Sequence, residues 1–383
     1  MKRFFLFLML FFAGFSSHSQ FFMEVVNMGK SFIDTPENID TNYVYQLPAR
    51  FCFALTGVTQ MTGFFAYADF KILNTIEAQS LSYLGERLCK KVGFEAGYGS
   101  VSFGYDFELG QRSAQYKRSL SLGMSNLKWG VRFSYSGVQN NIISSLTIGK
   151  PDEVIYTDTI ETSEGLGKLR SFAVDGYYVF NNKRFGYTAT NTINVVQKHT
   201  SGSFLLAGRF LWSDLDTKED MNGLFESYAT TQLALGGGYS ANIVLWNRDI
   251  VNNDDRTIRN LTFNITATPL LSFVNYMQTR SYYVEFFEND DRRETLQKSD
   301  VWCYPSLNFI GSSALSMTWG RVYFTGQFQY SIFHFSSSGA VNDGKFQAPN
   351  MAIEGYDGDI LNDVNLHGFL YNWSLSAKLF YRF

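Results

Sequence analysis

The chain has 383 residues and a formal net charge of -3, and its 17% of charged residues is low beside the roughly 25% of ordinary soluble domains. Hydrophobic residues make up 45% and aromatic residues 17%, enough for either a large core or an apolar outer surface. The mild acidity argues against a nucleic-acid partner. The three cysteines, Cys52, Cys89 and Cys303, have neither metal-ligand nor CxxC spacing, which argues against a disulfide framework.

Residues 1–19 have the pattern of an export signal. Two basic residues supply the positive charge, an apolar run extends from Phe4 to Phe15, and small residues precede the expected cleavage between Ser19 and Gln20. The apolar run is shorter than the roughly 20 residues of a membrane-spanning helix. We therefore expect a cleaved signal peptide, with a retained anchor helix as the alternative.

The next segment, residues 20–49, shows neither strand nor helix periodicity. Turn-forming residues gather in it between Asp34 and Asn38. We interpret the segment as a lead-in that lies in the periplasm or packs inside the structure formed by the strands that follow.

Alternation of apolar and polar residues begins near Arg50 and recurs to the end of the chain. Such alternation predicts strands with one apolar and one polar face. The uncharged stretches 227–247 and 261–279 are long enough for membrane helices, but their serial Gly, Asn, Thr and Pro residues favour strands. The expected strands are 50–70, 92–98, 101–109, 119–125, 128–136, 169–180, 203–212, 230–245, 261–273, 305–318, 321–334 and 369–383.

The connections between these strands are alternately short and long. The apolar phase changes parity across Gly99 and Ser100, as a tight hairpin requires. Outer-membrane barrels combine short periplasmic turns with long extracellular loops. The long polar segments are 137–168, 277–300 and 335–366, and further tight connections are 125–127 and 319–321.

The last stretch, residues 369–383, has apolar residues at every odd position and aromatic residues near both ends. Aromatic girdles of this kind mark the two interfaces of a membrane barrel strand. The stretch ends with Tyr381 and Phe383, and this ending resembles the C-terminal strand signal of bacterial outer-membrane proteins. We expect this strand to engage the barrel-insertion machinery.

These patterns predict an all-β fold: a transmembrane antiparallel up-and-down β-barrel of about twelve strands, formed by residues 50–383, in the outer membrane of a Gram-negative bacterium. Twelve strands place both chain ends in the periplasm only if 50–70 is one strand. Splitting it at Thr62 and Gly63, and counting 185–196 as another strand, gives fourteen as the alternative.

Two segments in the middle of the chain carry a family resemblance. Residues 176–187 read GYYVFNNKRFGY and residues 197–206 read QKHTSGSFLL. They resemble an uncharacterised domain-of-unknown-function family of Bacteroidota outer-membrane proteins, and the similarity extends weakly to 236–239 and the chain's end. The resemblance implies an outer-membrane setting and transfers no activity or functional residue. From the residues themselves, 181–184 suits a turn, and 197–203 is either a solvated turn or a segment that lines the periplasmic end or folds into the lumen.

Catalytic candidates are weak. His334 and His367 close the last hairpin, and Ser336 to Ser338 follow the first of them, so a rim-level lipid hydrolase or acyltransferase is one alternative. No GxSxG or HExxH motif supports it, and His also suits an interfacial position. We therefore expect a non-enzymatic protein used for structure, narrow permeation or surface binding, and a dedicated importer is a further alternative.

No cofactor or metal is expected. The acidic clusters around Asp357 and Glu288 lack the spacing of a calcium-binding loop. Outer-membrane lipid and the insertion machinery are the expected partners, and nucleic acid is not.

The inward phase of the strands carries charges of both signs. About eight strands leave an interior that side chains fill, whereas sixteen or more leave a channel. Opposite charges that face each other across a narrow lumen pair, since an unpaired buried charge is costly. We predict a constricted lumen, although small inward residues such as Gly104 and Ser121 leave space. The expected lumen-facing charges are Glu95, Asp106, Glu108, Lys128, Arg132, Asp175, Arg209, Arg321, Lys378 and Arg382.

Overall fold

The computed structural model describes residues 39–72, 76–84, 88–109, 118–150, 153–161, 167–192, 194–216, 227–248, 257–286, 292–339 and 361–383. The chain divides into two compact units, Met1–Ile39 and Asp40–Phe383, and all elements below belong to the second. The predicted signal peptide, most of the lead-in and the acidic clusters around Asp357 and Glu288 lie outside the described residues. Within the described ranges, no helix is long and apolar enough to cross a membrane.

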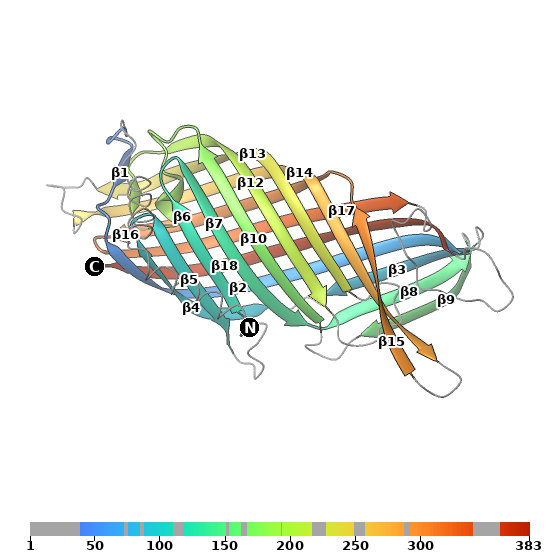
Figure 1. The fold of residues 1–383 in the computed structure, drawn as a ribbon. Helices are drawn as coiled ribbons and strands as arrows, with labels where there is room; N and C mark the ends of the chain where they lie inside the picture. Colours follow the sequence, from blue (N-terminus) through green and yellow to red (C-terminus); the bar gives the residue numbers. More distant parts are fainter. Residues whose placement is uncertain are drawn as a thin grey trace, which may run out of the picture. The chain divides into compact units, whose positions relative to one another are not determined.

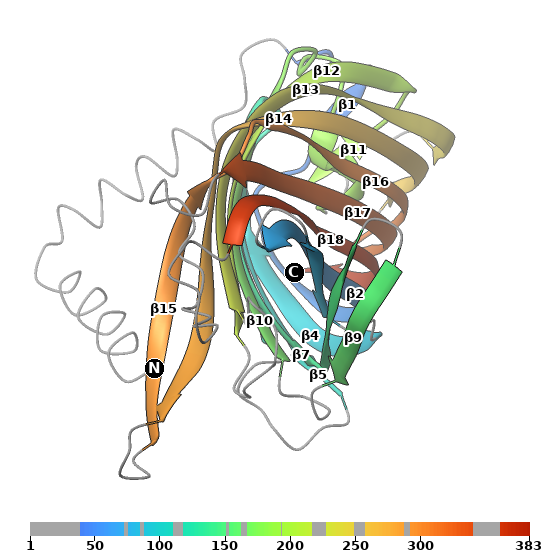
Figure 2. The ribbon, with the colours of Figure 1, turned by 90° about the vertical axis from the view of Figure 1, so that its right-hand side faces the viewer.

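Twelve antiparallel strands close into a ring (Figures 1 and 2). The last strand pairs with the first, from Leu361 opposite Ile72 to Arg382 opposite Cys52, and this pairing closes the sheet. In ring order the strands are β2 (Phe51–Ile72), β4 (Cys89–Tyr98), β5 (Val101–Glu108), β6 (Arg118–Ser125), β7 (Trp129–Asn140), β10 (Gly167–Val179), β12 (Ser201–Asp216), β13 (Ser227–Arg248), β14 (Arg259–Phe286), β16 (Ser306–Trp319), β17 (Val322–Gly339) and β18 (Leu361–Arg382).

The predicted twelve-stranded ring is confirmed. β2 runs for 22 residues through Thr62 and Gly63, so the split strand, and with it the fourteen-stranded alternative, is wrong. The additional strand expected at 185–196 is replaced by a short 3-10 helix, η1 (Tyr187–Thr190), and by β11 (Val195–Gln197), which pairs with β1 (Val44–Gln46) outside the ring.

One end of the ring carries the tight turns, and we call it the turn end. Gly99 and Gly320 adopt left-handed conformations there, with φ of 55° and 61°, which residues with a Cβ rarely take. The C-terminal residue lies at this end, where the Phe383 N–H donates to the Phe51 carbonyl oxygen (Figure 1).

The opposite end is the loop end, where several strands extend past the ring. β3 (Ile76–Leu84), β8 (Ile142–Lys150) and β9 (Glu153–Glu161) form a ladder beside the end of β2. β15 (Arg292–Trp302) pairs with the extended part of β14, and Figure 2 shows this hairpin projecting away from the ring. The segments predicted as long loops therefore contain hairpins of their own.

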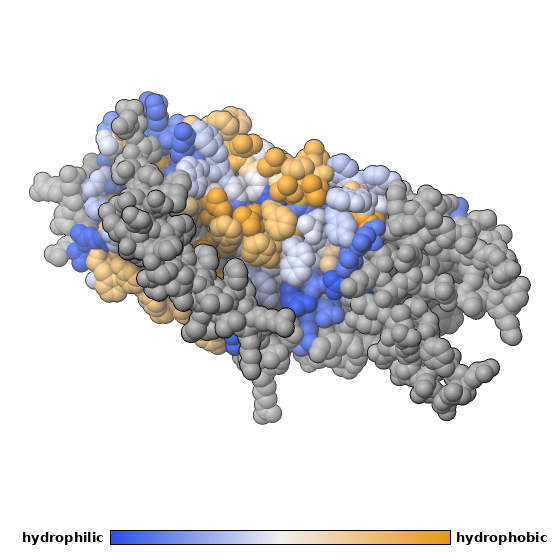
Figure 3. Space-filling model, in the orientation of Figure 1, coloured by the Kyte–Doolittle hydropathy of each residue, from blue (hydrophilic) through white to orange (hydrophobic). Residues whose placement is uncertain are grey.

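The outer face of the ring is apolar. On β18, Leu375 and Leu379 are 55% and 50% exposed, whereas the alternate residues Ser374 and Ser376 point inward and line a cavity. Figure 3 shows hydrophobic residues gathered over the middle of its visible face. Every strand of the ring exposes at least one large apolar side chain, for example Leu55, Phe94, Phe103, Leu122, Phe133, Tyr178, Phe204, Leu235, Leu271, Leu315, Phe324 and Leu375.

Candidate functional site

The lumen at the turn end is occupied by two segments, Asp40–Pro48 and the described residues of 181–200, which we call the plug. They are joined by the β1–β11 pairing, in which Val44 lies opposite Gln197. The buried Val196 side chain packs with Leu47 of the first segment, and the buried Phe185 side chain packs against Val179 and Leu205 of the ring. The connection between β10 and β12 thus folds inward because it carries apolar residues that need covering.

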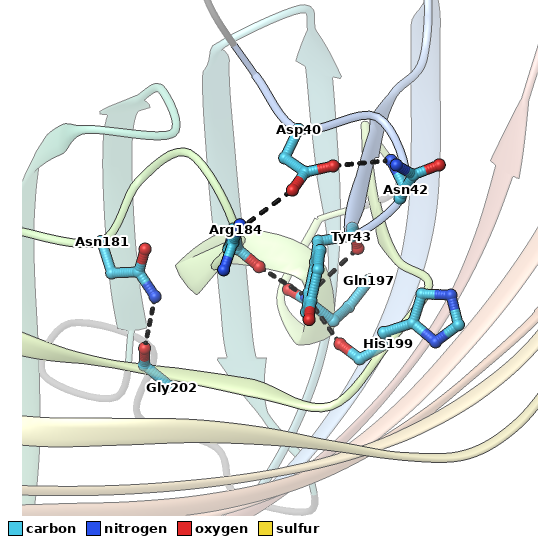
Figure 4. A network of polar contacts seen from close by, with 8 residues as sticks. All are labelled: Asp40, Asn42, Tyr43, Asn181, Arg184, Gln197, His199 and Gly202. Carbon is cyan, nitrogen blue, oxygen red and sulfur yellow. Dashed lines mark hydrogen bonds and ion pairs between the residues drawn. The ribbon is translucent and has the colours of Figure 1, made fainter.

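Gln197 is the centre of the plug (Figure 4). Its buried side-chain Nε2 donates to the carbonyl oxygens of Tyr43, Arg184 and His199 at 3.2, 2.8 and 2.8 Å. Its Oε1 accepts the Gly186 N–H at 2.8 Å. A single amide therefore ties the lead-in to the β10–β12 connection, and the solvated-turn interpretation is wrong at Gln197.

The outer surface of the plug is polar (Figure 4). Asp40 accepts a charged hydrogen bond from Arg184 Nε at 3.1 Å. The Arg184 guanidinium lies 5.1 Å from the ring centre of Tyr43, and the His199 ring approaches the same ring edge-on at 5.7 Å. The Asn181 side chain donates to the Gly202 carbonyl oxygen at 2.9 Å and so fixes the start of the connection against β12.

Inward side chains of the ring hold the plug from several sides. All of these contacts are hydrogen bonds from wall side chains to plug carbonyl oxygens, which places the plug inside the ring. They are Asn242 to Gly186 at 2.8 Å, Asn260 to Gln197 at 2.9 Å, Tyr323 to Ala189 at 3.2 Å, Thr325 to Thr190 at 2.9 Å, and Arg382 to Pro48.

Beyond the plug the lumen widens into two adjoining cavities of about 200 and 210 Å³, which we call the chamber. Hydroxyl, amide and charged side chains dominate its wall. Tyr187 and Thr188 of the plug line the second cavity, so the plug forms the floor of the chamber. Both cavities are lined by Glu95, Ser121, Arg132, Asp175, Gln327, Gln329 and Lys378.

Most of the chamber charges have partners. Lys378 Nζ lies 2.7 Å from Glu95 Oε2, and Arg209 Nε lies 3.2 Å from Asp175 Oδ1. Asp106 accepts a hydrogen bond from the Thr56 hydroxyl. Two pairs of opposite charges on nearby strands of the wall therefore neutralise each other.

Lys91 is a buried chamber charge that the sequence did not point to. Its Nζ donates to Ser119 Oγ at 2.7 Å and to Gln60 Oε1 at 3.3 Å. Lys91 shares the inward phase of Glu95, but the expected strand began at Val92, whereas β4 begins at Cys89. A longer strand would have included it.

The ten predicted lumen charges divide into several groups. Six line the chamber: Glu95, Asp106, Arg132, Asp175, Arg209 and Lys378. Among the other four, Arg382 is buried against the plug, Glu108 is half-buried on β5 opposite Lys91, and Arg321 is half-buried in the turn before β17.

The lumen position predicted for Lys128 is wrong. Lys128 precedes β7, in the turn at the turn end, and its side chain is exposed. Its Nζ lies 5.4 Å from the ring centre of Tyr178, an outward-facing residue. Strand alternation does not extend into the turn, so parity misplaces its side chain.

Toward the loop end, buried apolar side chains cross the lumen. Phe64 on β2 lies 5.3 Å from Tyr228 on β13 and 5.6 Å from Phe335 on β17, measured between ring centres. β2 and β13 are five pairings apart in the ring of twelve, so the first contact spans the lumen. Phe333 is buried in the same cluster. We call Phe64, Tyr228, Phe333 and Phe335 the aromatic closure.

The histidine candidates do not form a catalytic arrangement. His334 and His367 lie on the outer face, and their strand partners are Phe369 and Ser336 respectively. The His334 Nδ1 is 3.1 Å from the Leu307 carbonyl oxygen. The Ser337 and Ser338 hydroxyls bond to residues 302 and 304, so neither of these two serines is oriented by a histidine.

Cysteine and carboxylate chemistry is equally sparse in the part of the chain that the structure covers. Cys52, Cys89 and Cys303 take part in no disulfide bond. No group of three or more His, Cys, Asp or Glu residues there could hold a metal ion. At the chain's end, Tyr381 and Phe383 are exposed with ring centres 5.0 Å apart, on the apolar outer face.

Comparison with known proteins gives a family and distant structural neighbours. A family model described as "Domain of unknown function (DUF4421)" matches residues 38–253, and no curated protein sequence matches the chain. The translocator domain of the autotransporter NalP from Neisseria meningitidis is 10% identical, with a TM-score of 0.30, over 97% of this chain and 98% of that one. The β domain of the Bordetella autotransporter BrkA is 8% identical, with a TM-score of 0.26, over 85% and 99% of the two chains.

Proposed function

The chain belongs to the DUF4421 family of unknown function, and we propose that it is an integral β-barrel of a bacterial outer membrane with a lumen closed at rest. We assign it no enzymatic role. It acts through structure, narrow and controlled permeation of small solutes, or binding by the hairpins at its loop end.

The observation that carries this proposal is the inverted distribution of side chains around the ring. All twelve strands present large apolar residues outward, while hydroxyl, amide and charged groups point inward. Soluble monomers rarely expose apolar patches above a few hundred Å². A lipid-facing apolar band around a polar interior is the arrangement of membrane barrels.

The asymmetry of the two ends supports an orientation. Membrane barrels have short turns in the periplasm and long loops outside. We therefore assign the turn end, with Asp40 and Phe383, to the periplasm, and the hairpins of β8–β9 and β14–β15 to the cell surface. Export by residues 1–19, and insertion led by the terminal strand with Tyr381 and Phe383, complete this proposal.

Fractionation and surface proteolysis test it. Expressed in a Gram-negative host, the protein is expected in outer membranes, resistant to urea extraction, and shifted in gel mobility on heating as a closed barrel unfolds. Protease added to whole cells is expected to cut within 137–168 or 335–366 and to spare 181–184. Recovery in the soluble fraction contradicts membrane insertion, and cleavage confined to 181–184 reverses the orientation.

A further inference from the structure

Three charged side chains lie side by side at one level of the chamber wall. Strand register places Asp175 on β10 opposite Arg132 on β7 and, on its other side, opposite Arg209 on β12. The carboxylate pairs with Arg209, whose Nε lies 3.2 Å from Asp175 Oδ1. The row therefore carries two positive charges and one negative charge.

The two arginines of the row differ in their surroundings. Arg209 is also covered by Phe333, whose ring centre lies 4.7 Å from its guanidinium carbon. Arg132 lines both cavities, and among the described residues it has no hydrogen-bond or ion-pair partner.

The plug covers this part of the wall. Burial, together with the nearby Asp175 carboxylate, raises the pKa of the Tyr187 phenol to about 12, and Arg132 opposes that rise. Tyr187 is therefore an uncharged neighbour of the row and does not neutralise Arg132. Lys378, which also lines both cavities, is paired with Glu95. The net positive charge of the three-residue row therefore stays on Arg132.

We propose that the chamber binds a small anion, a carboxylate or a phosphate, on the guanidinium of Arg132. A guanidinium presents a planar fork of N–H donors that matches both groups bidentately. The Arg132 side chain is exposed within the chamber, so its guanidinium is accessible to an anion that enters it. Because the plug forms the chamber floor, the anion enters or leaves when the plug moves. This site goes beyond the proposed closed barrel and is tested separately from it.

Equilibrium binding to the refolded chain in detergent tests the site, with inorganic phosphate and acetate as separate probes at low ionic strength. Arg132→Gln is expected to weaken binding at least about tenfold, and Arg132→Lys to retain part of it. Asp175→Asn is expected to strengthen binding, since it raises the net charge of the row. Lys128→Gln removes a cation outside the chamber and should change nothing.

The outcomes decide the proposal and the anion class. If Arg132→Gln weakens the binding of only one probe, that probe identifies the anion class. If it weakens the binding of both probes, the result supports a general anion site. Wild-type affinity retained in Arg132→Gln overturns the site. Gln197→Leu frees the plug and so gives the anion access to the chamber. If neither the wild type nor Gln197→Leu binds either probe, the site is also overturned, because restricted access cannot then explain the lack of binding. Heat-shifted gel mobility of each variant reports the closed barrel independently.

Discussion

At the scale of single residues, the Gln197 amide determines whether the turn end is closed. Its five polar contacts reach both plug segments and β13, the last at 3.3 Å through Asn242. An apolar side chain of similar size would fill the space but leave the Gly186 N–H and several carbonyl oxygens without a partner. Each buried unsatisfied group costs roughly 1–3 kcal/mol.

Gln197→Leu is therefore expected to release the plug without breaking the ring, because the twelve strands pair independently of Gln197. Loss of about 2–4 kcal/mol of plug stability would expose Arg184 and Lys198 to trypsin from the turn end. The measurement is the rate of tryptic cleavage of the folded barrel in detergent. Lys198→Arg, which keeps the tryptic site and alters only the exposed hydrogen bond to the Thr41 carbonyl oxygen, is the matched control. Equal cleavage of both variants contradicts the central role of Gln197.

Residue positions could be predicted from the sequence where strand parity holds. Glu95, Asp175 and Lys378 were placed toward the lumen by alternation alone, and they line the chamber. Parity misplaced Lys128, because that residue belongs to a turn. Gln197 could not be identified as the plug centre, since its contacts come from residues up to 154 positions away.

At the scale of elements, the twelve ring strands could be predicted because the membrane-barrel pattern imposes period two on each of them. The extensions β3, β8, β9 and β15 were missed. They lie beyond the ring at the loop end and lack an apolar band, so the polar segments that contain them gave no membrane-strand pattern. Their pairings, such as Ser82 opposite Ser144, join parts of the chain that no local pattern connects.

The tight turns make a prediction at this scale. Gly320→Val forces a β-branched residue to φ near 61°, which should cost about 1–2 kcal/mol and slow formation of the β16–β17 hairpin. The measurement is the urea midpoint for unfolding in detergent. Gly57→Ala in β2 is the control, because an added Cβ there meets nothing within 4 Å and the backbone is not left-handed. A lower midpoint for the control than for Gly320→Val contradicts the explanation.

The outward face of β18 makes another prediction. Leu375→Arg places a charge among exposed apolar residues and should destabilise the barrel in lipid bilayers by roughly 2–4 kcal/mol if this depth is mid-membrane. Ser376→Arg, one position along, points its charge into the chamber and should be tolerated better. Denaturant unfolding from vesicles measures both. Equal destabilisation would show that the outer face of β18 does not contact lipid.

At the scale of the whole molecule, two closures lie in series along one lumen. The plug closes the turn end through hydrogen bonds, and the aromatic closure fills the lumen toward the loop end through apolar contacts such as Phe64 to Tyr228. The sequence predicted a constricted lumen from mixed charge. The structure adds the plug and the aromatic closure, both built from long-range contacts that strand alternation does not reveal.

Closures in series make a distinctive prediction for conductance in planar bilayers, because the narrowest point limits the current. The wild-type chain is expected to show no steady porin-sized conductance. Gln197→Leu opens only the turn end, and Phe64→Ala, which removes a ring shared by two aromatic contacts, opens only the loop end, so each alone should pass little current. The double variant should conduct far more than the sum of the two single variants.

Phe328→Ala on the outer face, combined with Gln197→Leu, controls for the loss of an aromatic ring as such. Because Phe64→Ala removes a buried ring at a cost of about 3–5 kcal/mol, heat-shifted mobility must first show that each barrel is folded. Steady conductance in the wild type, or full conductance in Gln197→Leu alone, contradicts closure at two levels.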